Sequence, residues 1–222
     1  MAAADVPWLG QRLREERVRQ GMSVRGLARD VGVSASMISQ IETAKSQPSV
    51  STLYAITSAL GISIEDLFTP PLPAPVAAAP VSPAPAPAPG AARTGTSVAD
   101  ALQSIRGGRL GPLVRPDGRR VLHLDSGVTW ELLGELPHRA ADFLLVTYAP
   151  GGTSSSSGGL MRHPGAEYGF LQSGRLVLTL GFEEIELGPG DAISFDSNTP
   201  HAYRNDGAEP AVGVWFVLER VR

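Results

Sequence analysis

Two kinds of hydrophobic periodicity divide the chain. In residues 1–69 apolar residues recur every three or four positions, which is the spacing of one face of an α-helix. From about residue 120 onward, short runs alternate between apolar and polar residues and are separated by glycine-rich turns, the pattern of β-hairpins. The pattern predicts a multidomain chain, with an all-helical N-terminal domain over 1–69 and an all-β C-terminal domain over 96–222.

A proline-rich segment separates the two patterns. Nine of the 19 prolines lie within residues 70–95, and alanine fills most of the remaining positions. This composition favours an extended polyproline II chain over helix or sheet. We therefore predict a Pro/Ala linker at 70–95, with the two domains placed loosely relative to each other. After the linker, a short helix or strand is expected at Val98–Ile105.

Glycine and serine residues mark the ends of the predicted helices. A first helix is expected from Val6 to Gln20, with its arginines on the outer faces, and Gly21 ends it. Serine is a preferred N-cap residue because its side chain accepts a hydrogen bond from a free backbone N–H. The serines expected to begin the later helices are Ser23, Ser34, Ser49 and Ser63. Together these signals predict a bundle of up to five short helices.

The middle of this domain has the spacing of a helix-turn-helix motif. Ala28 is small enough to let two helices cross closely, and Gly32 supplies the backbone freedom that a three-residue turn requires. Ile38 and Ile41 would then hold the second helix of the motif on the core. The opposite face of that helix, Ala35–Thr43, would remain free.

Residues 8–68 resemble the XRE family of bacterial DNA-binding domains, which are five-helix, lambda-repressor-like bundles. The resemblance implies that Ala35–Thr43 enters the major groove, where a glutamine can pair with adenine through two hydrogen bonds. It assigns DNA bases or phosphates to ten positions. They are Ser23, Arg25, Ser34, Ala35, Ser36, Ser39, Gln40, Lys45, Ser46 and Gln47. The alternative is a helical interaction module that binds no DNA.

Charge and composition narrow these expectations. The formal net charge is −3, and residues 1–69 hold seven basic and seven acidic residues, so DNA binding would depend on a local cationic face. The chain has no cysteine, which excludes disulfides, thiolate zinc sites and cysteine nucleophiles. No apolar run reaches the roughly 18 residues of a membrane span. We expect a cytoplasmic protein without a membrane partner.

The C-terminal domain carries two motifs that resemble those of the cupin family. The first motif is matched by His163, Glu167, Tyr168 and Gly174. The second is matched approximately by Pro189, Gly190, His201 and Asn205. The resemblance implies a double-stranded β-barrel, or jelly roll, over residues 96–222. The serine- and glycine-rich stretch 154–159 is expected to form a mobile loop, and His123 and His138 are interpreted as surface or structural residues.

Strand alternation would bring four polar residues into one pocket at the barrel mouth. These candidate effector-binding residues are His163, Glu167, His201 and Tyr203. In one interpretation His163, Glu167 and His201 form a facial triad for Fe, Mn, Ni or Zn. In the other, the same groups hydrogen-bond an organic effector or one another without a metal. Met161 favours the second, because metal-binding cupins usually carry a further histidine there and a thioether is a poor ligand for hard divalent ions.

The order of the two domains resembles a class of bacterial transcription regulators with a cupin sensor. That resemblance implies a homodimer that binds a palindromic double-stranded operator and a small-molecule effector, without catalysis. The alternative is an enzyme, because the same order resembles the iron-dependent hydroxypropylphosphonate epoxidase, with His163, Glu167 and His201 as iron ligands. The small polar residues Ser36, Ser39 and Gln40 of the second motif helix favour DNA binding.

Overall fold

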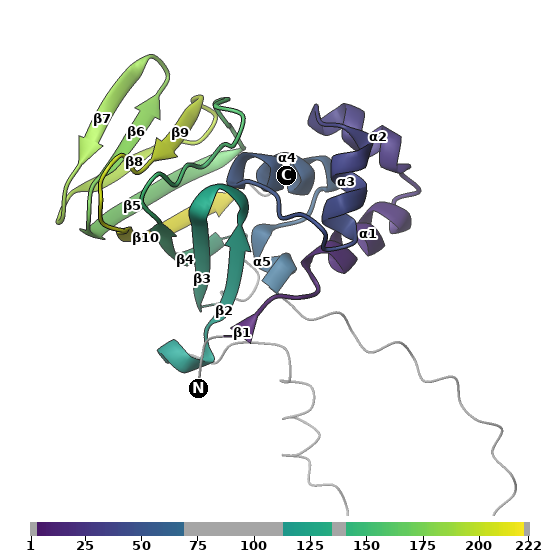
Figure 1. Ribbon diagram of the computed structural model, residues 1–222, viewed down its shortest axis with the longest axis horizontal. Coiled ribbons are helices and arrows are strands. Elements are labelled where there is room, and N and C mark those ends of the chain that lie inside the picture. The colour runs from purple at the N-terminus through teal and green to yellow at the C-terminus, as the bar shows by residue number, and fades with distance from the viewer. Residues whose placement is uncertain (1–3, 69–112, 135–140, 220–222) are drawn as a thin grey trace, which may run out of the picture.

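The computed structural model describes residues 4–68, 113–134 and 141–219 (Figure 1). The predicted linker 70–95, the element expected at Val98–Ile105 and His138 lie outside these residues. The helices are α1 (Leu9–Arg19), α2 (Val24–Val31), α3 (Ala35–Glu42), α4 (Val50–Leu60) and α5 (Ile64–Phe68). The strands are β1 (Ala4–Asp5), β2 (Arg120–Leu124), β3 (Val128–Gly134), β4 (Ala141–Tyr148), β5 (Gly165–Ser173), β6 (Leu176–Leu180), β7 (Glu183–Leu187), β8 (Ala192–Asp196), β9 (His201–Arg204) and β10 (Ala211–Glu219).

Serine caps and a left-handed glycine build the helix-turn-helix as the spacing predicted. The hydroxyl of Ser23 accepts a hydrogen bond from the backbone N–H of Gly26 at 3.0 Å, and the hydroxyl of Ser34 accepts one from Met37 at 3.1 Å. Gly32 ends α2 with a φ of 79°, a conformation that glycine adopts without steric cost. The turn between α2 and α3 therefore follows directly from local sequence.

Helix α1 begins later than predicted, at Leu9 instead of Val6. The residues before it take part in the sheet, since β1 pairs in parallel with β2 and the N–H of Val6 donates to the carbonyl of Val121 at 3.0 Å. The Val6 amide is thus committed to the β-domain. Local periodicity could not predict this, because the partner strand lies more than 100 residues away in the sequence.

Helix α1 is fixed to α3 by two features that the sequence did not reveal. The side chain of Arg17, expected on an outer face, is buried and bonds both carboxylate oxygens of Glu42 at 2.5 and 2.8 Å. Gly10 allows close contact, because a Cβ there would lie 2.2 Å from the carbonyl oxygen of Ile41. The orientation of α3 therefore depends on a buried ion pair and on a glycine.

The β-domain consists of two sheets that face each other as a jelly roll (Figure 1). The larger sheet has the order β1-β2-β3-β4-β10-β5-β8, and the smaller has the order β7-β6-β9. Burial alternates along β10, with Trp215 and Val217 inside and Val214 and Phe216 on the outer face. The all-β domain predicted from the alternating runs and the jelly roll implied by the resemblance to cupins are both confirmed.

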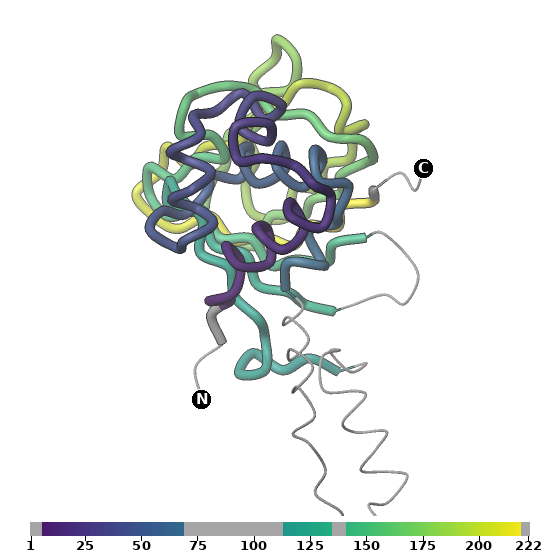
Figure 2. The backbone as a smooth tube through the Cα atoms, turned by 90° about the vertical axis from the view of Figure 1, so that its right-hand side faces the viewer, coloured from purple at the N-terminus to yellow at the C-terminus, as the bar shows by residue number. Residues whose placement is uncertain are grey.

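The helical domain packs directly on the barrel, and Figure 2 shows the helices in front of one of its ends. The N–H of Ser51 in α4 donates to the carbonyl of Ser154 at 2.9 Å, and the N–H of Asp125 donates to the carbonyl of Pro48 at 2.9 Å. Buried side chains of both domains form one continuous hydrophobic cluster. The structure therefore differs from the predicted loose placement.

The serine-rich loop is also more integrated than expected. Ser154 is fully buried, its N–H donates to the carbonyl of Tyr203, and its hydroxyl accepts from the N–H of Tyr203. With the bond to Ser51, three hydrogen bonds hold this residue between the two domains. The composition of the loop suggested mobility, but these tertiary contacts fix its start at Ser154, while residues 156–159 are exposed.

Candidate functional site

The ten residues assigned to DNA lie on one part of the helical domain. They occupy the start of α2, the start and outer face of α3, and the loop after α3 (Figure 1). Ser46 and Gln47 of that loop also line a cavity whose other wall includes Val121, Leu122 and His123 of β2. All ten assigned residues are exposed except Ala35 and Ser46, which are half-buried. Among the described residues neither Arg25 nor Lys45 forms an ion pair, so both cations are available to phosphates. The hydroxyl of Ser34 already serves as the helix cap.

The four polar residues predicted for the barrel pocket are brought together around one carboxylate. Oxygen Oε1 of Glu167, in β5, lies 2.8 Å from Nε2 of His163 and 2.9 Å from Nε2 of His201. The hydroxyl of Tyr203 donates to Oε2 at 2.8 Å, and Nε1 of Trp215 donates to that hydroxyl at 3.2 Å. Each of these five side chains is buried.

The hydrogen-bonded neighbours keep this carboxylate charged. Burial by itself raises the pKa of Glu167, but the hydrogen bonds and charges of His163 and His201 outweigh it and lower the pKa to about 2. Burial by itself lowers the pKa of His201, yet its bond to Glu167 leaves that pKa raised. Desolvation raises the pKa of the Tyr203 hydroxyl, so it remains a donor. The pocket therefore holds an ionised carboxylate among apolar surfaces.

The arrangement also fits a divalent metal ion. Ligand atoms of His163, Glu167 and His201 all lie within 4.8 Å of one another. Nδ1 of His201 donates to the carbonyl of Thr199 at 2.8 Å, which directs Nε2 toward Glu167, and metal-bound histidines are commonly oriented in this way. Ligand atoms that bind one ion at about 2.1 Å in octahedral geometry are about 3.0 Å apart, close to the nitrogen–oxygen separations here.

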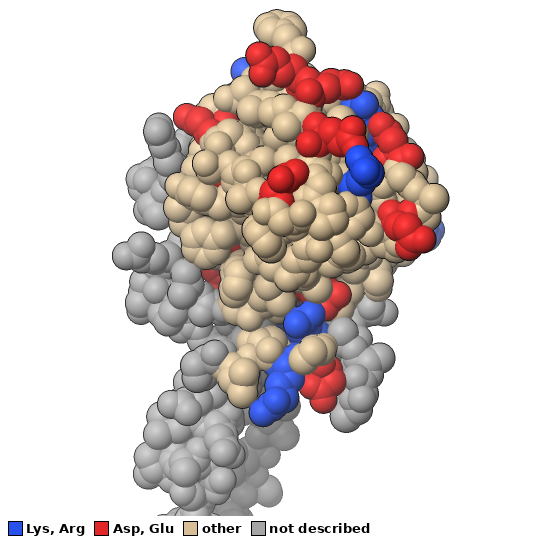
Figure 3. All heavy atoms as spheres, turned by 90° about the vertical axis from the view of Figure 1, so that its left-hand side faces the viewer, with Lys and Arg blue, Asp and Glu red and all other residues tan. Residues whose placement is uncertain are grey.

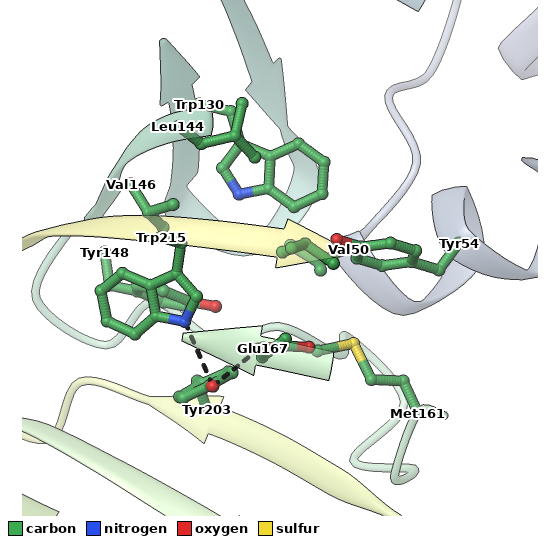
Figure 4. A pocket seen from close by; sticks show the side chains of 11 residues that line it. Val50, Tyr54, Trp130, Leu144, Val146, Tyr148, Met161, Glu167, Tyr203 and Trp215 are labelled. Carbon is green, nitrogen blue, oxygen red and sulfur yellow. Dashed lines mark hydrogen bonds between the residues drawn. The ribbon is translucent and has the colours of Figure 1, made fainter. Parts of the chain in front are cut away.

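Aromatic residues from both domains complete the pocket (Figure 4). Trp130 and Tyr148 belong to the barrel, whereas Val50 and Tyr54 project from α4 of the helical domain. The ring of Tyr54 stacks on the imidazole of His163, with centroids 4.1 Å apart and 3° between the planes. The cavity that remains has a volume of about 20 Å³. This is room for a molecule the size of water.

Sequence reasoning missed these lining residues, although signals for them existed. Val128, Trp130 and Leu132 alternate with the polar residues Thr129 and Glu131 along β3, a pattern that indicates inward-facing apolar side chains. Helix α4 buries Val50 and Tyr54 in addition to the apolar stripe that contacts α2. A helix that is apolar around most of its circumference is covered on more than one side. The sequence pattern of α4 therefore indicated that a second surface, besides α2, covers this helix, but it did not indicate which surface.

Three other residues singled out in the sequence of the β-domain have structural positions. The side-chain amide of Asn205 donates to the carbonyls of Tyr148 and Glu209, so this residue secures the end of β9. His123 is exposed, and its Nδ1 lies 3.2 Å from the hydroxyl of Thr129. Met161 is buried, pairs with the backbone of His201 and lines the pocket near Glu167 (Figure 4).

Comparison with known proteins assigns both domains. A helix-turn-helix family model matches residues 13–67, and a cupin domain model matches residues 144–217. The HTH-type transcriptional regulator PuuR of Escherichia coli (strain K12) is 27% identical over 201 residues, which cover 90% of this chain and 88% of PuuR. The regulator SutR of the same strain is 36% identical over 64 residues, 29% of this chain and 36% of SutR.

A solved structure shares the whole arrangement. The HTH_3 family transcriptional regulator from Vibrio cholerae superposes with a TM-score of 0.60 at 20% identity, covering 97% of each chain. At this identity the similarity establishes the fold.

Among the described residues no helix is both long and apolar enough to cross a membrane. The curated relatives above are HTH-type transcriptional regulators, and the two domain matches identify the chain as an XRE-type helix-turn-helix transcriptional regulator with a C-terminal cupin domain.

Proposed function

We propose that this regulator acts in the cytoplasm as a homodimer that binds a palindromic operator and responds to a small-molecule effector in the barrel. The observation that carries the proposal is that one chain combines two candidate binding sites. An exposed polar face begins at the N-terminus of α3, and a buried carboxylate lies among aromatic side chains inside the barrel. The first suits base contacts, and the second suits a small ligand.

For DNA, α3 is the proposed recognition helix. Ser36, Ser39 and Gln40 would face base edges in the major groove, with Gln40 suited to adenine. Arg25 and Lys45 flank this face and would contact phosphates, which position the protein without selecting a sequence. Ser23, Ser46 and Gln47 would add contacts from the neighbouring helix start and loop. Ser34 and Ala35 would hold the first turn of α3 close to the groove.

For dimerisation, we propose the outer face of the larger sheet. On this face Phe216 of β10 lies opposite Phe143 of β4 and Tyr168 of β5, and in the next row Val214 lies opposite Leu145 and Phe170. The side chains of Phe143, Tyr168 and Phe170 are 37–48% exposed. Contiguous exposed apolar rows of this kind mark interaction sites.

The second copy of the chain is the partner that this surface fits. A palindrome has two-fold symmetry, and a two-fold dimer places the same surface patch of each copy against itself. On the side of the molecule turned away from the helices, acidic side chains gather in the upper part of the view and an area without charged residues lies below them (Figure 3). An uncharged patch can pair with its own copy without like-charge repulsion.

In the barrel, the effector would be anchored at Glu167 and its partners. We propose that His163, Glu167 and His201 hold a divalent ion, one of Fe, Mn, Ni or Zn, which supplies a fixed positive centre for an oxygen or nitrogen atom of the effector. Tyr203 and Trp215 orient the carboxylate through the hydrogen-bond chain that ends at Oε2. The aromatic walls would select the size and shape of the effector.

A selection of genomic fragments by the purified full chain tests the regulator. The parent should enrich a palindrome, and a Ser36→Ala/Gln40→Ala variant should enrich none while retaining weak, salt-sensitive binding. Ser58→Ala, an exposed serine of α4 outside the proposed DNA face, is the matched control and should enrich the same palindrome as the parent. Failure of the parent to bind DNA even at low salt, where phosphate contacts alone suffice, contradicts the proposed function.

A further inference from the structure

The barrel pocket is closed by the DNA-binding domain itself. Val50 and Tyr54 stand one turn apart on α4 and form the part of the pocket lining that does not come from the barrel. Tyr54 is 4% exposed, and its ring contacts the imidazole of His163 and also meets Trp130 edge-on at 5.7 Å. The same tyrosine therefore belongs to the domain that carries α3 and to the wall of the effector site.

The pocket in this state cannot hold an organic effector. A cavity of about 20 Å³ admits one water-sized molecule, and even a small metabolite is several times larger. Something in the wall must move before such a molecule can reach Glu167. The barrel walls resist movement, because β5 and β10 are hydrogen-bonded to strands on both sides.

Helix α4 is the part of the wall that can leave. Outside its apolar contacts, α4 is joined to the barrel by the bond from Ser51 N–H to Ser154. The helical domain as a whole is also joined to it by Asp125 N–H to Pro48, Val6 N–H to Val121 and Arg120 to the carbonyl of Phe68, bonds that would break when the domain undocks. A packed interface between two domains of one chain can open as a unit, whereas a strand inside a sheet cannot. Displacement of Tyr54 from His163 therefore moves α4, and α4 belongs to the same bundle as the recognition helix.

We propose that Tyr54 is a lid shared by the two domains, so that an effector in the barrel and α4 docked on the barrel exclude each other. This inference rests on the proposed effector site and adds its regulation. In the docked state the two recognition helices of a dimer are held at one spacing, which favours simultaneous binding of both half-sites. Effector binding undocks the helical domains, removes that fixed spacing and weakens binding to the palindrome.

The effector need not be known to test the lid. The experiment compares full-length parent, Tyr54→Ala, His163→Ala, the double variant and Tyr54→Phe on two DNA fragments, the selected palindrome and a single half-site. Tyr54 and His163 both lie away from the proposed DNA face. Loss of docking should therefore lower affinity for the palindrome by about tenfold and leave half-site affinity unchanged. Hydrogen exchange of the same proteins without DNA reports docking directly.

Four results support the lid. Each alanine variant loses palindrome affinity, the double variant loses no more than either single one, Tyr54→Phe retains parent affinity, and exchange rises in α4 and β5 only in the alanine variants. Non-additivity is the signature of two residues that act through one contact. Unchanged palindrome affinity in both alanine variants, or fully additive losses, overturns the lid.

Two further results separate this proposal from its premises. If the parent binds neither fragment, the proposal that this chain recognises DNA is wrong, and hydrogen exchange without DNA becomes the only test of the lid. In that case unchanged exchange of β5 in Tyr54→Ala refutes it. If Tyr54→Ala also loses affinity for the half-site, this substitution has disrupted the helical domain. The affinities of His163→Ala, which alters only the barrel side of the contact, then test the lid.

Discussion

The ring of Tyr54 in α4 lies parallel to the imidazole of His163, with 4.1 Å between the ring centroids. One residue belongs to the DNA-binding domain and the other to the polar centre of the barrel. Through this contact the domain that carries the proposed DNA-binding face packs directly against the proposed effector site. A regulator needs this kind of connection, because coupling between sites requires a structural element that both ligands influence.

Tryptophan fluorescence offers a first check on this contact. Trp130 and Trp215 line the pocket beneath Tyr54, and the third tryptophan, Trp8, can be replaced by phenylalanine to remove its signal. In that background we expect Tyr54→Ala to increase quenching by acrylamide severalfold, because the quencher gains access to both indoles. Tyr54→Phe keeps the ring in place and should leave quenching unchanged. Equal quenching in both variants would show that the pocket is sealed by other residues.

Gln40 and Lys45 should affect DNA binding in different ways. Gln40→Ala should remove about 1–3 kcal/mol of discrimination at one base pair, because a base-edge contact is lost. Lys45→Ala should weaken binding to all sequences and reduce the slope of log affinity against log salt by about one, because one phosphate contact is lost. Fluorescence anisotropy at several salt concentrations on operator and scrambled DNA measures both. The assignments are wrong if the two variants behave alike.

The elements of the helical domain could be predicted because their signals are local. Ser23, Ser34 and Gly32 act on amides within a few residues of themselves, so caps and turns followed from the sequence. The positions of His163, Glu167 and His201 around one centre relied on the resemblance to the cupin barrel, since their strands are not adjacent in sequence. Docking of the domains could not be predicted, because apolar surface in α4 does not specify which surface covers it.

The proposed dimer surface predicts a specific response to charge. Phe170→Arg should dissociate the dimer, because a guanidinium would be buried against its own copy at the apolar rows of β5 and β10. Phe182→Arg is the matched control, since Phe182 is fully exposed at the turn between β6 and β7 and should leave the dimer intact. Sedimentation velocity gives the mass of each species. A Phe170→Arg variant that remains dimeric assigns the interface to another face.

The ion pair between Arg17 and Glu42 should contribute strongly to the stability of the helical domain. Arg17→Ala leaves a buried carboxylate without its partner, which typically costs about 3–5 kcal/mol. Arg14→Ala, on the exposed side of the same helix, should change stability by less than about 0.5 kcal/mol. Urea unfolding followed by far-ultraviolet circular dichroism compares them. Similar midpoints for both variants would mean that α3 is held in place by packing alone.

The polar centre of the barrel makes the last prediction, which concerns metal. We expect the parent to bind one equivalent of Co²⁺, with an absorption spectrum that reports two imidazoles and a carboxylate, because three convergent ligand atoms and an oriented His201 suit a divalent ion. His201→Ala should lower the affinity at least about tenfold. His123→Ala should have no effect, since His123 lies on the surface away from this centre. If neither the parent nor the Tyr54→Ala variant, whose pocket is open, binds Co²⁺, the metal proposal is wrong. Glu167 would then contact the effector directly through its own charge.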